Sequence, residues 1–347
     1  MDILIDQLEA KVDLQQSEIE QCAEFLLDAQ ASSEKKAFIL EALSKKGETP
    51  SEIAGFVEVF LRHAVDPQLS DLDFAGPTLD MCGTGGDQLH LFNVSTTAMF
   101  IAAAAGAVIV KHGNRGITSK SGGADVLEAM GVKLDISPDS FRRCIENAGV
   151  GFLFAPSYHP AFKAVVEARK MLGSRKVRTI FNLIGPLLNP ARPRCQLVGV
   201  YDRDLCPIFA DILQRMGRRS VWAVHGRTSD GAAVDEVSLM GPTWIFRGGT
   251  HALPGQDVIL PEDWGMPSVE VSELQGGDAK ENAVILEKIL RGQDRGPKRN
   301  MVLLNAAAAL VCAGLAKSMG DGLILAQETI DRGTAWEKVR LLREYAS

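Results

Sequence analysis

The sequence predicts an α/β protein with a run of helices at its amino-terminal end and a mostly parallel sheet further along the chain. Over residues 1–65, apolar residues recur at the spacing of amphipathic helices that bury one face. After residue 77, short apolar runs typical of buried strands alternate with helical segments. Such alternation favours parallel strands that are connected by helices packed on the sheet.

The amino-terminal helices have recognisable starting and ending signals. Ser17–Glu20 and Thr49–Glu52 have the spacing of a capping box, in which a hydroxyl and an acidic side chain satisfy free backbone N–H groups. Gly47 is expected to end the helix that begins near residue 33. Residues 66–77 are acidic and contain two prolines, so we interpret them as a linker before the first strand.

The remaining elements follow from short apolar runs and the turn residues between them. The expected strands are 78–82, 107–111, 150–154, 196–200 and 220–225, and the expected helices between them are 124–130, 161–172 and 207–216. Residues 243–275 contain many turn residues and are expected to be irregular. The carboxy-terminal third returns to helix.

Composition excludes several classes of protein. The chain has 347 residues, of which 46% are hydrophobic, so it can bury a large core. No apolar run approaches the roughly 18 residues of a membrane span, and the start of the chain has no basic leader, so we expect a cytoplasmic protein without membrane contacts. Six scattered cysteines suggest neither disulfides nor zinc. A net charge of −7 argues against general nucleic-acid binding.

Three neighbouring segments have the chemistry of a phosphate site. GTGGD at Gly83–Asp87 follows the first expected strand, FNVST at Phe92–Thr96 begins a helix, and KHGNR at Lys111–Arg115 follows the second strand. Glycines let a backbone approach an anion closely, and a helix amino terminus attracts one. The same pattern also punctuates ordinary α/β units, in which the hydroxyl groups only cap helices.

Together these motifs resemble those of anthranilate phosphoribosyltransferases. Further matches cover nearly the whole chain: SKSGGADVLEAMGV from Ser119, RTIFNLIGPLLNP from Arg178, VDEVS from Val234 and GGDAKENA from Gly276. The resemblance implies transfer of a phosphoribosyl group from 5-phosphoribosyl 1-diphosphate (PRPP) to the amine of anthranilate. It also implies a homodimer formed through the helical domain.

The family resemblance implies a division into two domains. A small all-helical domain would comprise residues 1–76 and an insertion at about 158–190, and residues 77–157 and 191–347 would form the large α/β domain. The substrates would bind between the two domains.

The resemblance also assigns residues to roles. The PRPP-binding positions are Gly83, Gly86, Asp87, Asn93, Ser95, Thr96, Lys111 and Ser119. The acceptor-binding positions are Gly83, His112, Asn114 and Arg169, although a buried structural histidine is an equally good interpretation of His112. The Mg²⁺ ligands would be Ser95, Asp235 and Glu236, since magnesium uses few protein carboxylates and keeps water and phosphate ligands. No residue is assigned as a general acid or base.

The chain departs from the family pattern at several positions near the substrates. They are Gln88, Leu91, Thr118 and Gly123, together with two extra residues near 174–177. Losing one neutral hydrogen bond to phosphate costs about 0.5 to 1.5 kcal/mol, so PRPP binding should survive these changes. The identity of the acceptor depends on them more strongly.

Three other functions fit parts of the pattern. A phosphoribosyltransferase with another aromatic acceptor is the closest alternative, and an acceptor screen would distinguish it. A pyrimidine nucleoside phosphorylase would cleave thymidine or uridine with phosphate, but its lysine loop differs from KHGNR. A non-catalytic nucleic-acid-binding relative would use the basic residues between 169 and 194 and would show salt-dependent DNA binding.

Overall fold

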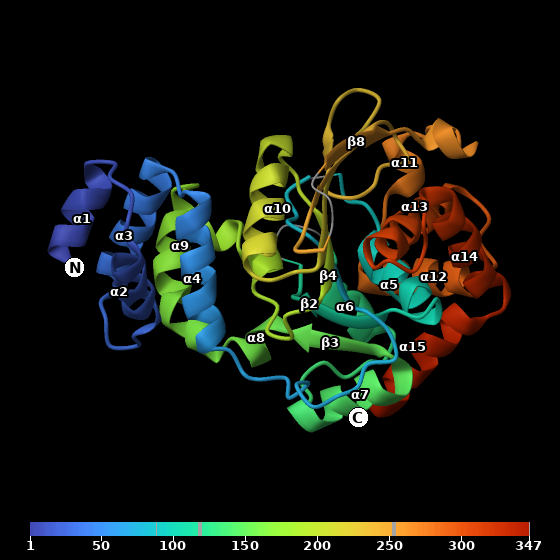
Figure 1. Cartoon of the computed structure of the whole chain (residues 1–347), viewed down its shortest axis with the longest axis horizontal. Helices are drawn as coiled ribbons and strands as arrows, with labels where there is room; N and C mark the ends of the chain where they lie inside the picture. The colour runs from blue at the N-terminus through green and yellow to red at the C-terminus, as the bar shows by residue number, and fades with distance from the viewer. Residues whose placement is uncertain (88, 117–119, 252–254, 347) are drawn as a thin grey trace. The chain divides into compact units, whose positions relative to one another are not determined.

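The computed structural model describes residues 1–87, 89–116, 120–251 and 255–346 (Figure 1). The chain divides into two compact units, of which the first comprises Met1–Asp66 and Ala155–Pro190 and the second comprises Pro67–Phe154 and Ala191–Ser347. Residues 67–76, which we expected to group with the helices, fall in the second unit.

The first unit is entirely helical within its described residues. Its helices are α1 (Asp2–Glu9), α2 (Gln16–Leu27), α3 (Ser33–Lys46), α4 (Pro50–Arg62), α8 (Ala155–Tyr158) and α9 (Val166–Ser174), with short 3₁₀ turns η1 (Pro160–Val165), η2 (Ile180–Asn182) and η3 (Gly185–Leu187). α3 packs against α1 and α9, and α2 packs against α4 and η1. The later segment therefore completes the core of the amino-terminal helices.

Local capping explains where these helices begin and end. The Thr49 hydroxyl accepts from the N–H of Glu52 at 3.2 Å, and the Glu52 carboxylate accepts from the N–H of Thr49 at 2.8 Å, as predicted. α3 ends at Gly47, which has φ of +86°. The capping box predicted at Ser17–Glu20 is wrong. α2 already begins at Gln16, because Glu18 reaches back and accepts from the backbone N–H that precedes the helix.

The second unit is built on a mixed sheet that is mostly parallel. Within the described residues its strands are β1 (Thr78–Gly83), β2 (Val108–Gly113), β3 (Val150–Phe154), β4 (Cys195–Gly199), β5 (Ser220–Arg227), β6 (Ala233–Val234), β7 (Thr243–Gly248) and β8 (Gly255–Ile259). Their order is β3-β2-β1-β4-β5-β7-β8, with β6 paired to β5. The first five strands pair in parallel, as predicted, and β6, β7 and β8 add antiparallel pairs.

The hairpin β7–β8 was not predicted, because residues 243–275 were expected to be irregular. β7 pairs with β5 along its whole length, and β8 forms the edge of the sheet with three of its five residues exposed. A half-exposed edge hairpin lacks the continuous apolar run of a buried parallel strand, so its pattern is weak. The same stretch also contains η5 (Pro261–Trp264) and α11 (Val271–Leu274).

Helices cover both faces of the sheet. They are α5 (Val94–Ala104), α6 (Gly123–Ala129), α7 (Pro138–Ala148), α10 (Cys206–Arg215), α12 (Ala279–Leu290), α13 (Pro297–Cys312), α14 (Met319–Asp331) and α15 (Thr334–Tyr345), with the short turn η4 (Arg203–Leu205) before α10. α10 lies on one face against β5 and β7, whereas α5, α13 and α14 lie on the other (Figure 1). The main core lies on that second face.

α13 shows why an alanine-rich helix suits this core. Ala306–Ala309 are completely buried, and a Cβ on Gly322 of α14 would lie 2.9 Å from the Ala307 carbonyl oxygen. Small residues thus allow α13, α14 and α5 to approach closely. Among the described helices, none combines the length and apolar character needed to cross a membrane.

Candidate active site

The carboxyl ends of β1 and β4 meet where the connections of the sheet diverge. β1 leads through α5 to β2 on one side, whereas β4 leads through α10 to β5 on the other. Gly83 ends β1 and Gly199 ends β4, and the two residues are partners in the sheet register. In open α/β sheets, ligands bind in the crevice outside such a switch point. The topology therefore places a candidate site at this edge.

The loop after β1 turns sharply through two glycines. Gly85 and Gly86 have φ of +70° and +100°, angles that residues with a Cβ rarely adopt. The N–H of Thr84 donates to the carbonyl of Gly199 at 2.9 Å, and the N–H of Tyr201 donates to the Thr84 hydroxyl at 3.1 Å. The loop is thus anchored to β4 where it leaves the sheet.

A short acidic segment, which contains Asp235 and Glu236, passes over three glycines at the same edge of the sheet. A Cβ on Gly83 would collide with the carboxylate of Asp235, and one on Gly199 would collide with the carbonyl of Asp235. A Cβ on Gly226, in β5, would lie 2.6 Å from the carbonyl oxygen of Glu236. The absence of side chains at these three positions lets the main chain of the acidic segment lie directly on the sheet.

The acidic side chains face the glycine loop and the start of α5. The Asp235 carboxylate accepts from the N–H of Gly85 at 2.7 Å, and the Glu236 carboxylate accepts from the N–H of Ser95 at 3.2 Å. Burial raises the pKa of both groups and of Asp87, which lies beside Asp235. The charge of Asp87 raises the pKa of Asp235 further, and the charge of Asp235 does the same for Glu236.

Asn93 directly precedes α5, but its side chain does not cap the helix. Its Nδ2 donates to the carbonyl of Ser121 at 3.1 Å, and its Oδ1 accepts from Nδ2 of Asn282 at 2.9 Å. The free amide of Ser95 instead reaches Glu236, so an acidic group from a distant segment satisfies the helix amino terminus. The Asn93 side chain therefore makes no capping hydrogen bond to the helix.

Lys111 projects from β2 towards the same helix start. Its Nζ donates to the carbonyl of Met81 and to the hydroxyl of Ser95, the latter at 3.2 Å. The residue is buried, and its charge lowers the pKa of Glu236 against the effect of burial. Thr96 is also buried in the first turn of α5. One cation therefore partly balances the acidic side chains.

The second loop is held by Asp125, at the start of α6. Its carboxylate accepts from the N–H of Gly116 at 2.8 Å and from the N–H of Gly122 at 2.7 Å, which closes the loop across its ends. Asn114 is exposed in this loop, whereas His112 is buried at the end of β2, where its N–H donates to Asp80 at 3.4 Å. Ser119 lies outside the described residues.

These residues suit a metal that takes most of its ligands from a substrate. In the described part of the chain, no three His, Cys, Asp or Glu side chains are grouped so that they alone could hold a metal ion. Asp235 and Glu236 nevertheless place two acidic groups side by side, and burial together with acidic neighbours raises the pKa of each. Mg²⁺ fits such a pair, since it binds through one or two carboxylates and substrate phosphates.

Comparisons with known proteins find relatives over most of the chain. The α/β domain model of a glycosyl transferase family matches residues 75–336, and its helical bundle domain model matches residues 3–64. An anthranilate phosphoribosyltransferase of Anaeromyxobacter dehalogenans is 45% identical, covering 95% of this chain and 94% of its own. One from Chloroflexus aggregans is 43% identical with the same coverage of both chains. This chain belongs to the anthranilate phosphoribosyltransferase family.

Solved structures of the family have the same fold. The anthranilate phosphoribosyltransferase of Thermus thermophilus superposes with a TM-score of 0.87 at 34% identity, covering 99% of both chains. The Saccharomyces cerevisiae enzyme, solved in complex with PRPP and Mg, gives a TM-score of 0.82 at 27% identity, covering 95% of this chain and 92% of that one.

The structure brings most positions assigned from the family motifs to one edge of the sheet in the second unit. Linked there by direct contacts are Gly83, Asp87, Ser95, Lys111, Asp235 and Glu236, with Gly86, Asn93 and Thr96 in the same two segments. His112 and Asn114 follow on from β2 in the neighbouring loop. Arg169 belongs to the helical unit instead.

Two supporting positions were missed by sequence reasoning. Asn282 lies in the family motif GGDAKENA, to which we gave no role, and it orients the amide of Asn93. Gly199 carries no motif of its own, because its function depends on a segment 36 positions along the chain passing over it. The motif match was a usable signal for Asn282, whereas only the sheet register reveals Gly199.

The departures from the family pattern have local explanations at two positions. A Cβ on Gly123 would lie 2.9 Å from the hydroxyl of Thr96, so glycine leaves room for that side chain. Leu91 forms an isolated bridge with Gln275 and packs against the core. Gln88 and Thr118 lie outside the described residues.

Arg169 is half-buried within the helical unit. Its guanidinium lies over the ring of Phe181 at 5.2 Å from the centroid, and Phe181 stacks on Phe60. Burial lowers the pKa of Arg169, but a guanidinium stays charged at neutral pH. The side chain is thus packed from one direction by aromatic rings, which restricts its orientation.

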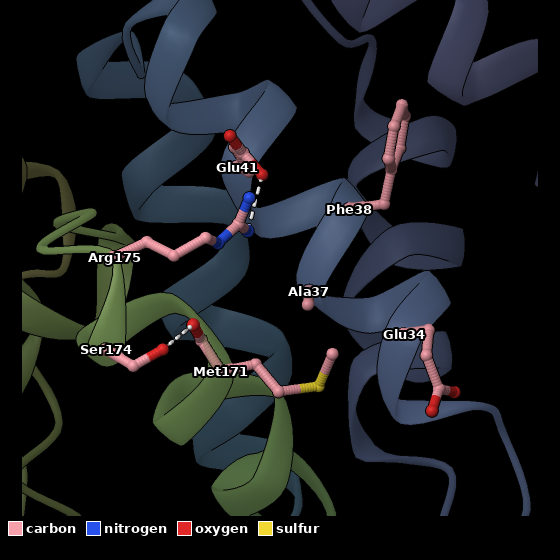
Figure 2. Close-up of a pocket in the computed structure, with 7 residues that line it drawn as sticks. All are labelled: Glu34, Ala37, Phe38, Glu41, Met171, Ser174 and Arg175. Carbon is pink, nitrogen blue, oxygen red and sulfur yellow. Dashed lines mark hydrogen bonds and ion pairs between the residues drawn. The ribbon is translucent and has the colours of Figure 1, made fainter.

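The helical unit also has a hollow of about 420 Å³ between α3 and α9 (Figure 2). Its lining comprises Glu34, Ala37, Phe38, Glu41, Met171, Ser174 and Arg175, of which none was assigned to substrate. Arg175 pairs with Glu41 at 2.7 Å across the hollow. Its walls are apolar at Phe38 and Met171, which suits another protein surface better than a phosphate.

Proposed function

We propose that this chain transfers the 5-phosphoribosyl group from PRPP to the amine of anthranilate, producing N-(5-phosphoribosyl)anthranilate and diphosphate in tryptophan biosynthesis. The observation that carries the proposal is the convergence of the glycine loop, the start of α5, Lys111 and the acidic pair at one switch point. It is supported by family membership, since curated relatives at 45% identity have this enzyme name.

PRPP is a polyanion, and the edge of the sheet offers several groups that suit it. We assign PRPP binding to Gly83, Gly86, Asp87, Asn93, Ser95, Thr96, Lys111 and Ser119. The positive φ of Gly86 opens the loop backbone to a phosphate, and the first turn of α5 adds the positive end of a helix dipole. Lys111 contributes a fixed positive charge close to Ser95.

Asp235, Glu236 and Ser95 would hold Mg²⁺, which would neutralise the negative charge of the departing diphosphate. The fit rests on the raised pKa values of the two acidic groups and their position beside the glycine loop. The protein fixes the direction of both side chains before binding, because the N–H groups of Gly85 and Ser95 each hold one carboxylate.

The acceptor needs orientation more than activation. We assign it to Gly83, His112, Asn114 and Arg169, with Arg169 binding the carboxylate of anthranilate. An aromatic amine is already a nucleophile, and the ribosyl carbon becomes cation-like as diphosphate departs, so no general base is required. Catalysis would then depend on positioning and on stabilising the leaving group.

The direct test is loss of anthranilate fluorescence in the presence of PRPP and Mg²⁺. Wild-type protein should consume anthranilate and release diphosphate in equal amounts, and omission of PRPP should stop both. No consumption at high enzyme concentration would contradict the proposal. Parallel reactions with other aromatic amines and acids would then identify a different acceptor.

We further propose a homodimer formed through the helical unit, in the cytoplasm. Phe38 and Met171 expose 44% and 40% of their surface beside the hollow in Figure 2, so a second copy of the chain would cover two apolar side chains there. All six cysteines lie in the described residues and are free thiols, which suits a reducing compartment. Light scattering should give twice the mass of one chain. The double variant with Phe38→Glu and Met171→Glu should have the mass of a single chain.

A further inference from the structure

Asn305 in α13 is completely buried and bonds to the main chain of the acidic segment. Its Oδ1 accepts from the N–H of Val237 at 2.9 Å, and its Nδ2 donates to the carbonyl of Val237, also at 2.9 Å. Nδ2 also donates to the carbonyl of Met301 at 2.9 Å, one turn earlier in the helix. The side-chain amide therefore pairs with Val237 as a neighbouring strand would.

Val237 directly follows Glu236, so this pairing fixes the end of the acidic segment. On the sheet side, the Ser238 hydroxyl donates to the carbonyl of Arg227 at 2.8 Å, and the N–H of Ser238 donates to the Thr243 hydroxyl at 2.8 Å. Those bonds connect the segment to β5 and β7. Asn305 is different, because it connects the segment to the helical layer on the sheet face.

The acidic segment has a physical reason to need this support. Asp235 and Glu236 are consecutive in sequence, and their carboxylates are held at the same edge of the sheet by the N–H groups of Gly85 and Ser95, so two like charges lie close together. Repulsion between like charges favours any movement that separates them or exposes them to water. The three glycines beneath the segment have no side chains that could hold it in place. The hydrogen bonds from Asn305 therefore oppose such movement by fixing the main chain at Val237.

We propose that Asn305 is a positioning residue for the reaction, which holds the carboxylates of Asp235 and Glu236 against the glycine loop before substrate binds. This inference rests on the proposed function, since PRPP with Mg²⁺ is the ligand that the two carboxylates would meet. Asn305 is completely buried and would act through the main chain at Val237. Its removal should weaken binding of PRPP with Mg²⁺ and leave the anthranilate side of the reaction unchanged.

Two variants separate the pairing with Val237 from the other contact of Asn305. Asn305→Ala removes all three hydrogen bonds. Asn305→Ser is too short to reach Val237, but its hydroxyl can keep a bond to the carbonyl of Met301 within the helix, so it is the milder change. Leu310→Ala is the matched control, because Leu310 is completely buried in the same helix but has no polar group to lose.

The first readout is hydrogen exchange in protein without ligands. The amides of Val237 and Ser238 should exchange at least about tenfold faster in both Asn305 variants than in wild type, since their protection depends on the segment staying in place. In Leu310→Ala, the exchange rates of these two amides relative to those of other core amides should be the same as in wild type. Unchanged protection of Val237 in Asn305→Ser would overturn the proposal.

The second readout is calorimetric titration with PRPP at low and high Mg²⁺ without anthranilate. Asn305→Ala and Asn305→Ser should bind PRPP about tenfold or more weakly at low Mg²⁺ and recover part of the loss at high Mg²⁺. The KM for anthranilate should stay within about twofold of wild type, because only the diphosphate side is affected. The proposal would be overturned if the Asn305 variants bound PRPP as tightly as wild type at both Mg²⁺ concentrations. It would also be overturned if Leu310→Ala lost as much PRPP affinity as they do.

The wild-type titration separates this inference from the proposed function. If wild-type protein does not bind PRPP with Mg²⁺, the proposed function fails, whereas the exchange of Val237 still tests whether Asn305 holds the segment. If wild type binds PRPP with Mg²⁺ and both Asn305 variants bind it as tightly as wild type, only the positioning role fails. Should Asn305→Ala not fold, Asn305→Ser gives the same comparison.

Discussion

Asp235 and Glu236 each carry a carboxyl group that would serve the reaction but lowers the stability of the fold when it is charged. Burial and an acidic neighbour raise the pKa of each carboxyl group in the folded protein. A raised carboxyl pKa means that the folded state binds protons more readily than the unfolded state. The contribution of these groups to stability is therefore greatest at low pH and is lost as pH rises from the ordinary carboxyl pKa through the raised values.

Neutral substitutions in the acidic pair should therefore separate stability from activity. We expect Asp235→Asn to increase the free energy of unfolding of metal-free protein at pH 8 by about 1 kcal/mol, since one pKa unit corresponds to 1.36 kcal/mol. Turnover should fall by about 100-fold or more, because the leaving group loses its support. Glu236→Gln should behave alike. Urea unfolding in a chelator and turnover with Mg²⁺ provide the two measurements.

The outcome that would contradict this prediction is near-normal turnover of both variants in limiting Mg²⁺. A loss of stability at pH 8 would instead show that the hydrogen bonds to Gly85 and Ser95 outweigh the repulsion between the acidic groups. The increase in stability should shrink at pH 5, where the wild-type carboxyl groups become protonated and the charge difference between wild type and variant disappears.

Gly86 should be required for its backbone conformation. At φ of +100°, any side chain strains the loop by about 1 to 2 kcal/mol, and a valine would also cover main chain that a phosphate must approach. We expect Gly86→Val to abolish PRPP binding measured by calorimetry. Gly217→Val is the matched control, because Gly217 has φ of +84° with open space around it and lies between α10 and β5, away from the site. Unchanged PRPP affinity of Gly86→Val would show that the loop is only structural.

At the scale of secondary structure elements, the sequence predicted what local rules control. The strand at residues 150–154 and the capping box at Thr49–Glu52 agree with the structure, because a continuous apolar run and a hydroxyl–acid pair act within a few residues. The hairpin β7–β8 could not be predicted in this way, since three of the five residues of β8 are exposed and the hairpin therefore lacks a continuous apolar run.

Long-range contacts also explain which parts of the candidate site the sequence could not predict. Motif matches indicate Asp235 and Ser95, but not that Glu236 caps the helix containing Ser95 across 141 positions. Asn305 stands in an alanine-rich run that reads as plain core, and its pairing with Val237 depends on how α13 packs on the sheet. Such residues have no local signal, because their role is created by the fold.

In the helical unit, a buried lysine connects two segments that are far apart in the sequence. Lys36 is buried in α3, and its Nζ donates to the carbonyl of Asp28 at 2.6 Å and to the carbonyl of Ala164, in η1, at 2.8 Å. Lys36→Met keeps the aliphatic stem but leaves both carbonyls without a donor. We expect a loss of about 1.5 to 3 kcal/mol in the free energy of unfolding, measured with urea.

The neighbouring residue Lys35 is the control for that prediction. It is partly exposed and pairs with Asp2 at the surface, so Lys35→Met should change stability by no more than about 0.5 kcal/mol. Turnover of Lys36→Met at low temperature should stay close to wild type, because neither carbonyl belongs to the candidate site. Equal stability of the two variants would show that water replaces Lys36 without cost.

At the scale of the whole molecule, the proposed reaction draws residues from both compact units. The PRPP and metal positions with described coordinates all belong to the second unit, whereas Arg169 belongs to the helical one. The sequence could assign Arg169 only through the family motif, because a helix arginine ordinarily points into water. Its packing on Phe181 restricts the side chain but does not itself identify a ligand.

Arg169 should therefore affect the acceptor and spare the donor. Its planar guanidinium can hold a carboxylate in a fixed direction, which would leave the ortho amine of anthranilate aimed at the ribosyl carbon. A hydrogen bond to a charged group contributes roughly 1.5 to 3 kcal/mol, so Arg169→Ala should lower kcat/KM for anthranilate by about 10- to 150-fold. PRPP affinity, measured by calorimetry, should stay close to wild type. Lys170→Ala is the matched control, because Lys170 is exposed and pairs with Glu167 at the surface of the same helix.

Aniline gives the deciding comparison, because it has the amine of anthranilate without the carboxylate. Wild type and Arg169→Ala should use aniline equally poorly, since the arginine has nothing to bind in either case. Steady-state kinetics with both acceptors at saturating PRPP and Mg²⁺ measure the difference. If Arg169→Ala loses activity equally on anthranilate and aniline, the residue supports the helical unit or the diphosphate instead. The acceptor role would then pass to His112 and Asn114, whose own alanine variants should discriminate between the two amines.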